Sequence, residues 1–123
     1  MIITDEKMRF KMDRALKIGG DTYTLDDIEA GLASGDMQGH VFEETWAITR
    51  VHDWSHKRSV DVICIVGDIQ GALILEQIVC EWAKSIEADF ITAIGRDGWW
   101  GFHTPGWQKA GTLYSKDLSN GQQ

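Results

Sequence analysis

The chain has 123 residues, 43% of them hydrophobic and 25% charged, and carries a formal net charge of −7 at pH 7. This length and composition are typical of a single globular domain spanning residues 1–123. An acidic surface repels phosphate backbones and no apolar run is long enough to cross a bilayer, so we expect neither a nucleic-acid nor a membrane partner.

The first part of the chain predicts a pair of helices over residues 5–34. Apolar side chains recur at helical spacing in residues 5–17, and a glycine pair ends that helix. The apolar face of this first helix carries Met8, Met12, Ala15 and Leu16. Thr24 followed three residues later by Asp27 is typical of a capping box, and the second helix that it starts stops at Gly35.

The middle of the chain predicts an antiparallel meander of strands. Val41 and Phe42 lie in the first strand, residues 45–54 alternate between two faces as the second, and residues 59–67 return as the third. The third strand is apolar on both faces after Asp61, which indicates a central strand covered on both sides.

A long helix and a fourth strand follow the meander. Asp68 predicts the N-cap of a helix that runs to about Ile86, and residues 88–95 form the next strand. The inner face of this helix is predicted to carry Leu75, Ile78, Val79, Trp82 and Ile86. A strand–helix–strand connection of this length implies a parallel strand pair in a right-handed crossover.

The last elements complete the predicted sheet. A short turn or helix around residues 97–104 leads to a final strand over residues 107–118, and residues 119–123 form a polar tail. The sheet and its crossover helix therefore occupy residues 38–118. The predicted fold class is α/β (α+β), a mixed α/β sandwich with an antiparallel meander, a crossover helix and a parallel strand pair.

Four short stretches, taken with this element order, resemble a known family. They are Thr24–Leu32, Glu81-Trp82-Ala83, Gly95-Arg96-Asp97-Gly98-Trp99 and Lys116-Asp117-Leu118. Over residues 22–118 the chain resembles the GNAT family of N-acetyltransferases, in particular a small branch found in tailed bacteriophages. The resemblance implies a GNAT-like mixed sheet whose two parallel strands splay apart, and in active members acetyl-CoA lies in that opening.

The resemblance also implies a cofactor turn between the third strand and the long helix, where backbone N–H groups hold a pyrophosphate. The residues that would form it here are Ile65, Val66, Gly67, Gln70, Gly71 and Ala72. This turn contains no arginine, and Asp68 caps the helix with a carboxylate that competes for the same N–H groups. The turn is therefore degenerate, and we expect no cofactor, with acetyl-CoA as the alternative.

Candidate catalytic residues, should the chain be active, follow from the chemistry of acetyl transfer. Glu43, Glu44 and His52 lie where a general base would sit on the meander, and Tyr114 could act as the late acid. The competing interpretation is that these side chains belong to the solvent-exposed face of the sheet and have no catalytic role.

The stretch GRDGWWGFHTPGW contains three of the six tryptophans. We expect Trp99 and Trp107 to close the core, because large aromatic side chains bury much area. Adjacent residues of a helix point about 100° apart, so Trp100 should face outward. Together with Arg96 and Phe102 it is the predicted interface.

The remaining reactive side chains predict no metal site and no nucleophile. His52 and His56 flank a predicted turn, and no cysteine or carboxylate pair completes a tetrahedral set of ligands. Cys64 and Cys80 have no CxxC partner and are expected to be buried free thiols.

Two functions of different classes remain open. In the first, the chain is a non-catalytic structural or interaction protein of a bacteriophage, located in the virion and contacting other virion proteins or copies of itself. In the second, it is an acetyl-CoA-dependent N-acetyltransferase of unknown acceptor that works in the host cytoplasm. No signal-peptide pattern opens the chain, so synthesis in the host cytoplasm is expected in both cases.

Overall fold

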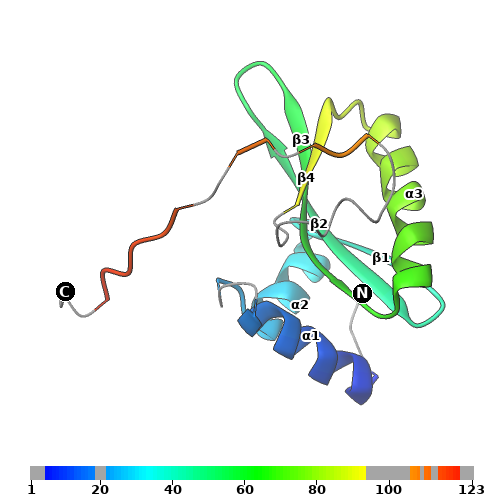
Figure 1. Ribbon diagram of the computed structural model, residues 1–123, viewed down its shortest axis with the longest axis vertical. Helices are drawn as coiled ribbons and strands as arrows, with labels where there is room; N and C mark the ends of the chain where they lie inside the picture. The colour runs from blue at the N-terminus through cyan, green and yellow to red at the C-terminus, as the bar shows by residue number, and fades with distance from the viewer. Residues whose placement is uncertain (1–4, 19–21, 94–105, 109, 112–113, 120–123) are drawn as a thin grey trace.

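In the residues that the structure describes, the fold is a four-stranded sheet with two helices on one face and one on the other (Figure 1). It is seen in a computed structural model that describes residues 5–18, 22–93, 106–108, 110–111 and 114–119. The helices are α1 (Glu6–Ile18), α2 (Leu25–Ser34) and α3 (Ile69–Ser85). The strands are β1 (Gln38–Phe42), β2 (Thr45–Asp53), β3 (Arg58–Val66) and β4 (Phe90–Ala93).

The sheet order is β1-β2-β3-β4, with β1, β2 and β3 antiparallel and β4 parallel to β3. The helix α3 makes the crossover between the two parallel strands, as a connection of this length requires. The predicted α/β class, the meander and the parallel pair are confirmed.

The helix pair forms where its local signals place it. The Thr24 backbone N–H donates to Asp27 Oδ2 at 2.9 Å, and the Asp27 N–H donates to Thr24 Oγ1 at 3.1 Å. Gly35 ends α2 with φ at +89°, a left-handed conformation that suits glycine. The capping box and the predicted stop are confirmed.

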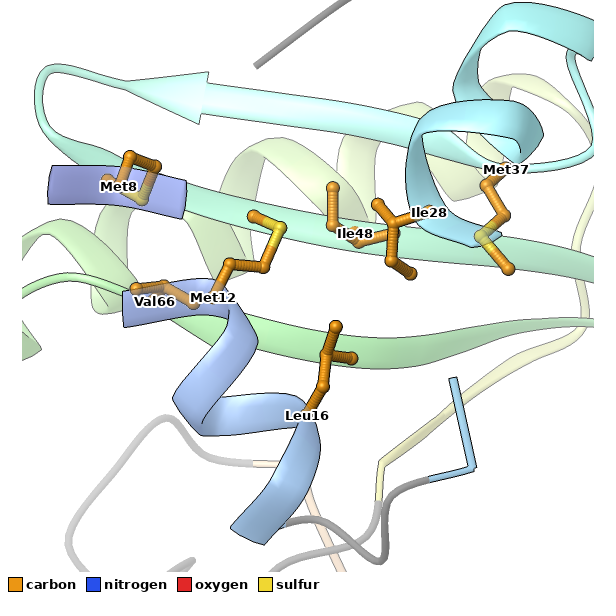
Figure 2. Close-up of a cluster of buried hydrophobic side chains, with 7 residues drawn as sticks. All are labelled: Met8, Met12, Leu16, Ile28, Met37, Ile48 and Val66. Carbon is orange, nitrogen blue, oxygen red and sulfur yellow. The ribbon is translucent and has the colours of Figure 1, made fainter. Parts of the chain in front are cut away.

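The first core lies between the helix pair and the sheet (Figure 2). Its buried side chains are Met8, Met12, Leu16, Ile28, Met37, Ile48 and Val66. Three of them recur every four residues along α1, so one stripe of that helix is buried and the rest faces water. The predicted apolar face of the first helix is confirmed, with Ala15 partly buried at its edge.

The second core lies between α3 and the other sheet face. Its buried side chains are Ala47, Val60, Leu75, Val79 and Ala83. The prediction was wrong for Ile78, which is 41% exposed. The stripe that faces the sheet runs through residues 72, 75, 76, 79 and 83, and residue 78 lies about 100° from residue 79 around the helix axis. Trp82 and Ile86 are partly buried against this core.

The predicted final strand over residues 107–118 does not form in those of its residues that the structure describes. Within it, residues 114–118 lie away from the sheet (Figure 1), with Tyr114 88% and Leu118 78% exposed. A strand is stabilised only by pairing and by packing against neighbours, so strand-like alternation without a neighbouring ladder does not produce one. The predicted turn at 97–104 lies outside the described residues, as does most of the polar tail.

Candidate functional site

A cavity of about 230 Å³ lies at the carboxyl end of the parallel strand pair. The β3–β4 ladder joins Ser59 to Phe90 at one end and Val62 to Ala93 at the other, whereas β3 itself continues to Val66. Beyond Val62 the cavity lies between β3 and α3, and the described side chains that line it come from both elements. Ligands of open α/β sheets bind in this position, outside the carboxyl ends of parallel strands.

The cavity wall is mostly apolar. Its described lining consists of Ala47, Val62, Ile65, Gly67, Asp68, Ile69, Ala72, Leu73, Leu75, Glu76, Val79, Ile91, Ala93 and Trp107. The two ionisable groups in this lining are both acids, Asp68 at the start of α3 and Glu76 two turns along it. The described wall therefore presents hydrocarbon and negative charge to anything that enters.

The N-terminus of α3 is closed by its own cap. Asp68 Oδ1 accepts a hydrogen bond from the Gly71 N–H at 2.7 Å, and the Ala72 N–H donates to the Asp68 carbonyl at 3.0 Å. An anion at this helix end would have to displace the Asp68 carboxylate and then face its charge. The predicted cap is confirmed, and the residues at this turn do not fit the pyrophosphate of acetyl-CoA.

The two glycines of the turn are explained by packing against β2. Gly67 has φ at +136°, and a Cβ added there would lie 2.5 Å from Thr45 Oγ1. A Cβ on Gly71 would also collide with Thr45 Oγ1. Thr45 is buried at the start of β2, so only glycines let the turn and α3 approach so closely.

The structure divides the predicted cofactor residues between different environments. Ile65, Gly67 and Ala72 line the cavity. Val66 belongs to the core on the opposite face of the sheet, and Gln70 is exposed.

The candidate catalytic residues are not brought together at the cavity. Glu43 and Glu44 are exposed in the turn between β1 and β2, and Glu43 has φ at +53°. His52 is exposed near the other end of β2, roughly 26 Å from Glu44 along a strand that rises about 3.3 Å per residue. Tyr114 lies in the exposed C-terminal segment.

Two residues that the sequence analysis did not assign to a site meet at the cavity. Glu76 Oε1 accepts hydrogen bonds from the Trp107 indole N–H at 3.2 Å and from the Cys80 thiol at 3.3 Å. Residues 72, 75, 76 and 79 follow the i, i+3, i+4, i+7 spacing of a helix face that packs on a core, and Glu76 is the acidic residue among apolar ones. This interruption of the apolar face is the signal in the sequence that could have identified Glu76. Trp107 is half-buried and lines the cavity, whereas Trp99, Trp100, Arg96 and Phe102 lie outside the described residues.

The two cysteines are poor nucleophiles. Burial raises the pKa of the Cys64 thiol to about 12. Burial, and then the hydrogen bond to Glu76, raises the pKa of Cys80 to about 11. Because the thiolate is the reactive form, neither group is poised for covalent chemistry near neutral pH. Within the described part of the chain, no three His, Cys, Asp or Glu side chains gather so that they could hold a metal ion.

An aromatic pair is exposed on the β2–β3 hairpin. Trp54 is 53% exposed, and its ring stacks on His52 with centroids 4.1 Å apart. The Trp54 indole N–H donates to Ser59 Oγ at 2.9 Å, and the Ser59 hydroxyl donates to Asp61 Oδ1 at 2.9 Å. Thr92 Oγ1 also donates to Asp61 Oδ1, at 2.8 Å. Trp54 is thus held in place by hydrogen bonds while part of its ring faces water.

Comparison with known proteins defines the fold and nothing further. No protein-family model and no curated protein matches the chain. The structure is similar to that of a tetramutant of the BH1408 protein from Bacillus halodurans, with a TM-score of 0.59 and 15% sequence identity. The match covers 91% of this chain and 90% of that one. No helix in the described ranges is long and apolar enough to span a membrane.

Proposed function

We propose that the protein is a non-catalytic interaction protein built on an acyltransferase-like fold. The observation that carries the proposal is the Asp68 carboxylate on the N-terminus of α3, 2.7 Å from the Gly71 nitrogen. A pyrophosphate needs free N–H groups and positive charge at that position, and this turn offers an occupied donor and a negative charge.

The positions of the polar side chains support the same conclusion. Acetyl transfer needs a base within hydrogen-bond reach of the acceptor and close to the cofactor. Glu43, Glu44, His52 and Tyr114 are exposed and do not line the cavity. Because these four side chains do not converge on the cavity, their arrangement is better suited to binding than to group transfer.

The stacked pair of Trp54 and His52 supports a role in protein contacts. Tryptophan is enriched among the residues that dominate binding energy, and a ring held by hydrogen bonds loses little freedom on binding. In this proposal the partners are other virion proteins or further copies of the chain, and the protein is located in the virion. That part rests on the resemblance of the sequence to the bacteriophage branch alone.

A second candidate function, acetyl-CoA-dependent N-acetyl transfer in the host cytoplasm, is favoured by one observation. The cavity lies at the carboxyl end of the parallel pair, where α/β proteins commonly bind ligands. This candidate requires the cofactor to bind despite the Asp68 cap.

Isothermal calorimetry with acetyl-CoA at low salt separates the two functions. We expect no heat of binding from the wild-type protein. Asp68→Asn keeps a side chain that can cap α3 but removes its charge, and Asp68→Ala removes both cap and charge. Binding that appears in these variants alone would identify a scaffold whose cofactor turn is blocked by the carboxylate. Micromolar binding by the wild type would overturn the proposal in favour of the enzyme.

A further inference from the structure

We infer that the cavity beside α3 binds a small hydrophobic amine, with the ammonium group held by the carboxylate of Glu76. The inference rests on the proposed function in one respect: both depend on the Asp68 carboxylate keeping phosphate groups away from the N-terminus of α3. It does not require a protein partner.

The volume and the wall of the cavity define the apolar part of the ligand. An apolar cavity of about 150 Å³ takes up benzene, and this one measures about 230 Å³. It therefore has room for one ring with a short side chain. Val62, Ile65, Leu75 and Ile91 supply the hydrocarbon surface that such a ring would contact.

The charges of the wall define the polar part. Asp68 and Glu76 are acids, and the described lining contains no Lys, Arg or His to balance them. The chain as a whole has a formal net charge of −7, so the surrounding field also favours a cation over an anion. A carboxylate or phosphate ligand would be repelled, and an ammonium would be attracted.

Glu76 is positioned to receive that ammonium. It lies on the sheet-facing stripe of α3 between Ala72 and Val79, where an apolar residue would fill the cavity at no cost in desolvation. The hydrogen bonds described for this side chain, from Trp107 and Cys80, both end on Oε1. They hold the carboxylate in one orientation and leave Oε2 as an acceptor for an N–H donor. Positions where the sequence breaks a local pattern in this way are typical of functional or strained sites.

The test compares three ligands that share a phenyl ring and a short linker and differ in charge: 2-phenylethylamine, 2-phenylethanol and 3-phenylpropanoate. Calorimetry of the wild-type protein should show the amine binding roughly tenfold tighter than the alcohol, since a hydrogen bond to a charged group is stronger than a neutral one. The acid should bind weakest. The indole N–H resonance of Trp107 should shift with the amine.

Matched variants of α3 assign the effect to one side chain. Glu76→Gln should abolish the preference for the amine over the alcohol, whereas Glu81→Gln, on the exposed side of the same helix, should leave it unchanged. Ala72→Leu, which narrows the cavity, should weaken all three ligands together. Equal affinities for the three ligands, tightest binding of the acid, or no binding at all would each overturn the inference. Acetyl-CoA is titrated in the same series, so its binding would overturn the proposed function separately from the result with the amine.

Discussion

His40, on β1, contacts α3 through its ring and is joined to β2 by a short hydrogen-bond chain. The ring lies 4.9 Å from that of Trp82, and Nε2 lies 2.9 Å from Thr49 Oγ1. The Thr49 hydroxyl donates to Gln38 Oε1 at 3.1 Å, so its oxygen is free to accept from His40 and the histidine Nε2 carries a proton. Burial lowers the pKa of His40 below its usual 6.5, since the cationic form loses hydration.

This histidine makes the stability of the fold depend on pH. Because its pKa is lower in the folded chain than in the unfolded chain, the unfolded state binds more protons in the interval between the two values. The contribution of neutral His40 is therefore complete above pH 6.5 and is lost as the pH falls through the folded pKa. Urea unfolding at pH 7.5 and 5.5 should show a smaller free energy of unfolding at the lower pH.

The variant His40→Gln should reduce that difference between the two pH values, and His56→Gln, in the exposed hairpin turn, should preserve it. A pH dependence that is equally steep in wild type and His40→Gln would contradict this assignment to His40.

At the scale of elements, the contact between the start of α3 and the start of β2 sets the position of the cavity. Thr45 is 2% exposed, and the turn that leads into α3 passes directly against it. The turn and the start of α3 can lie this close to Thr45 only because residues 67 and 71 are glycines, which have no Cβ. Glycines in such a turn would also allow the close backbone approach that a phosphate needs, so their presence alone does not distinguish packing from binding.

Gly71→Ala tests the packing explanation. The added methyl group would collide with Thr45 Oγ1, and overpacking of this kind costs about 1–3 kcal/mol of unfolding free energy. Adding Thr45→Ala should recover part of the loss, giving a favourable coupling in a double-mutant cycle measured by denaturant unfolding. Gly111→Ala, where a Cβ would meet no atom within 4 Å, is the control and should change little. Additive effects of the two substitutions would argue against the contact.

At the scale of the whole molecule, stability comes from two cores on opposite faces of one sheet. One lies under α1 and α2 and the other under α3, and the central strands β2 and β3 contribute to both. The described part of the C-terminal segment contributes Trp107 to the cavity wall, whereas residues 114–119 are exposed throughout. Of the described residues of this segment, Trp107 near its beginning is the one that lines the cavity.

Truncation after Leu113 should leave the thermal midpoint of unfolding within about 2 °C of the full chain, because surface changes of this kind shift stability by less than about 0.5 kcal/mol. Trp107→Ala should lower the midpoint by more, since it removes a half-buried ring and the hydrogen bond to Glu76. A large loss of stability on truncation would show that the distal segment packs on the domain.

Much of the fold was determined by the sequence alone, because its signals are local. The Thr24 and Asp68 caps, the methionine stripe of α1 and the alternation of β2 each depend on residues within a few positions of one another. Such patterns act through hydrogen bonds and burial within one element, so they predict where elements begin, end and face. The crossover connection followed from the number of residues between the two parallel strands, which is also a property of the sequence.

Only the tertiary structure decided how distant segments meet. In it, the described residues between 108 and 118 pair with no strand, Ile78 lies off the core, and Glu43 and His52 lie at opposite ends of β2. It also placed the Trp107 indole on Glu76, 31 residues earlier in the chain. The physical reason is that a strand, a cavity wall or a hydrogen-bonded acid is defined by partners far away in the sequence, whereas propensity and periodicity describe each segment by itself.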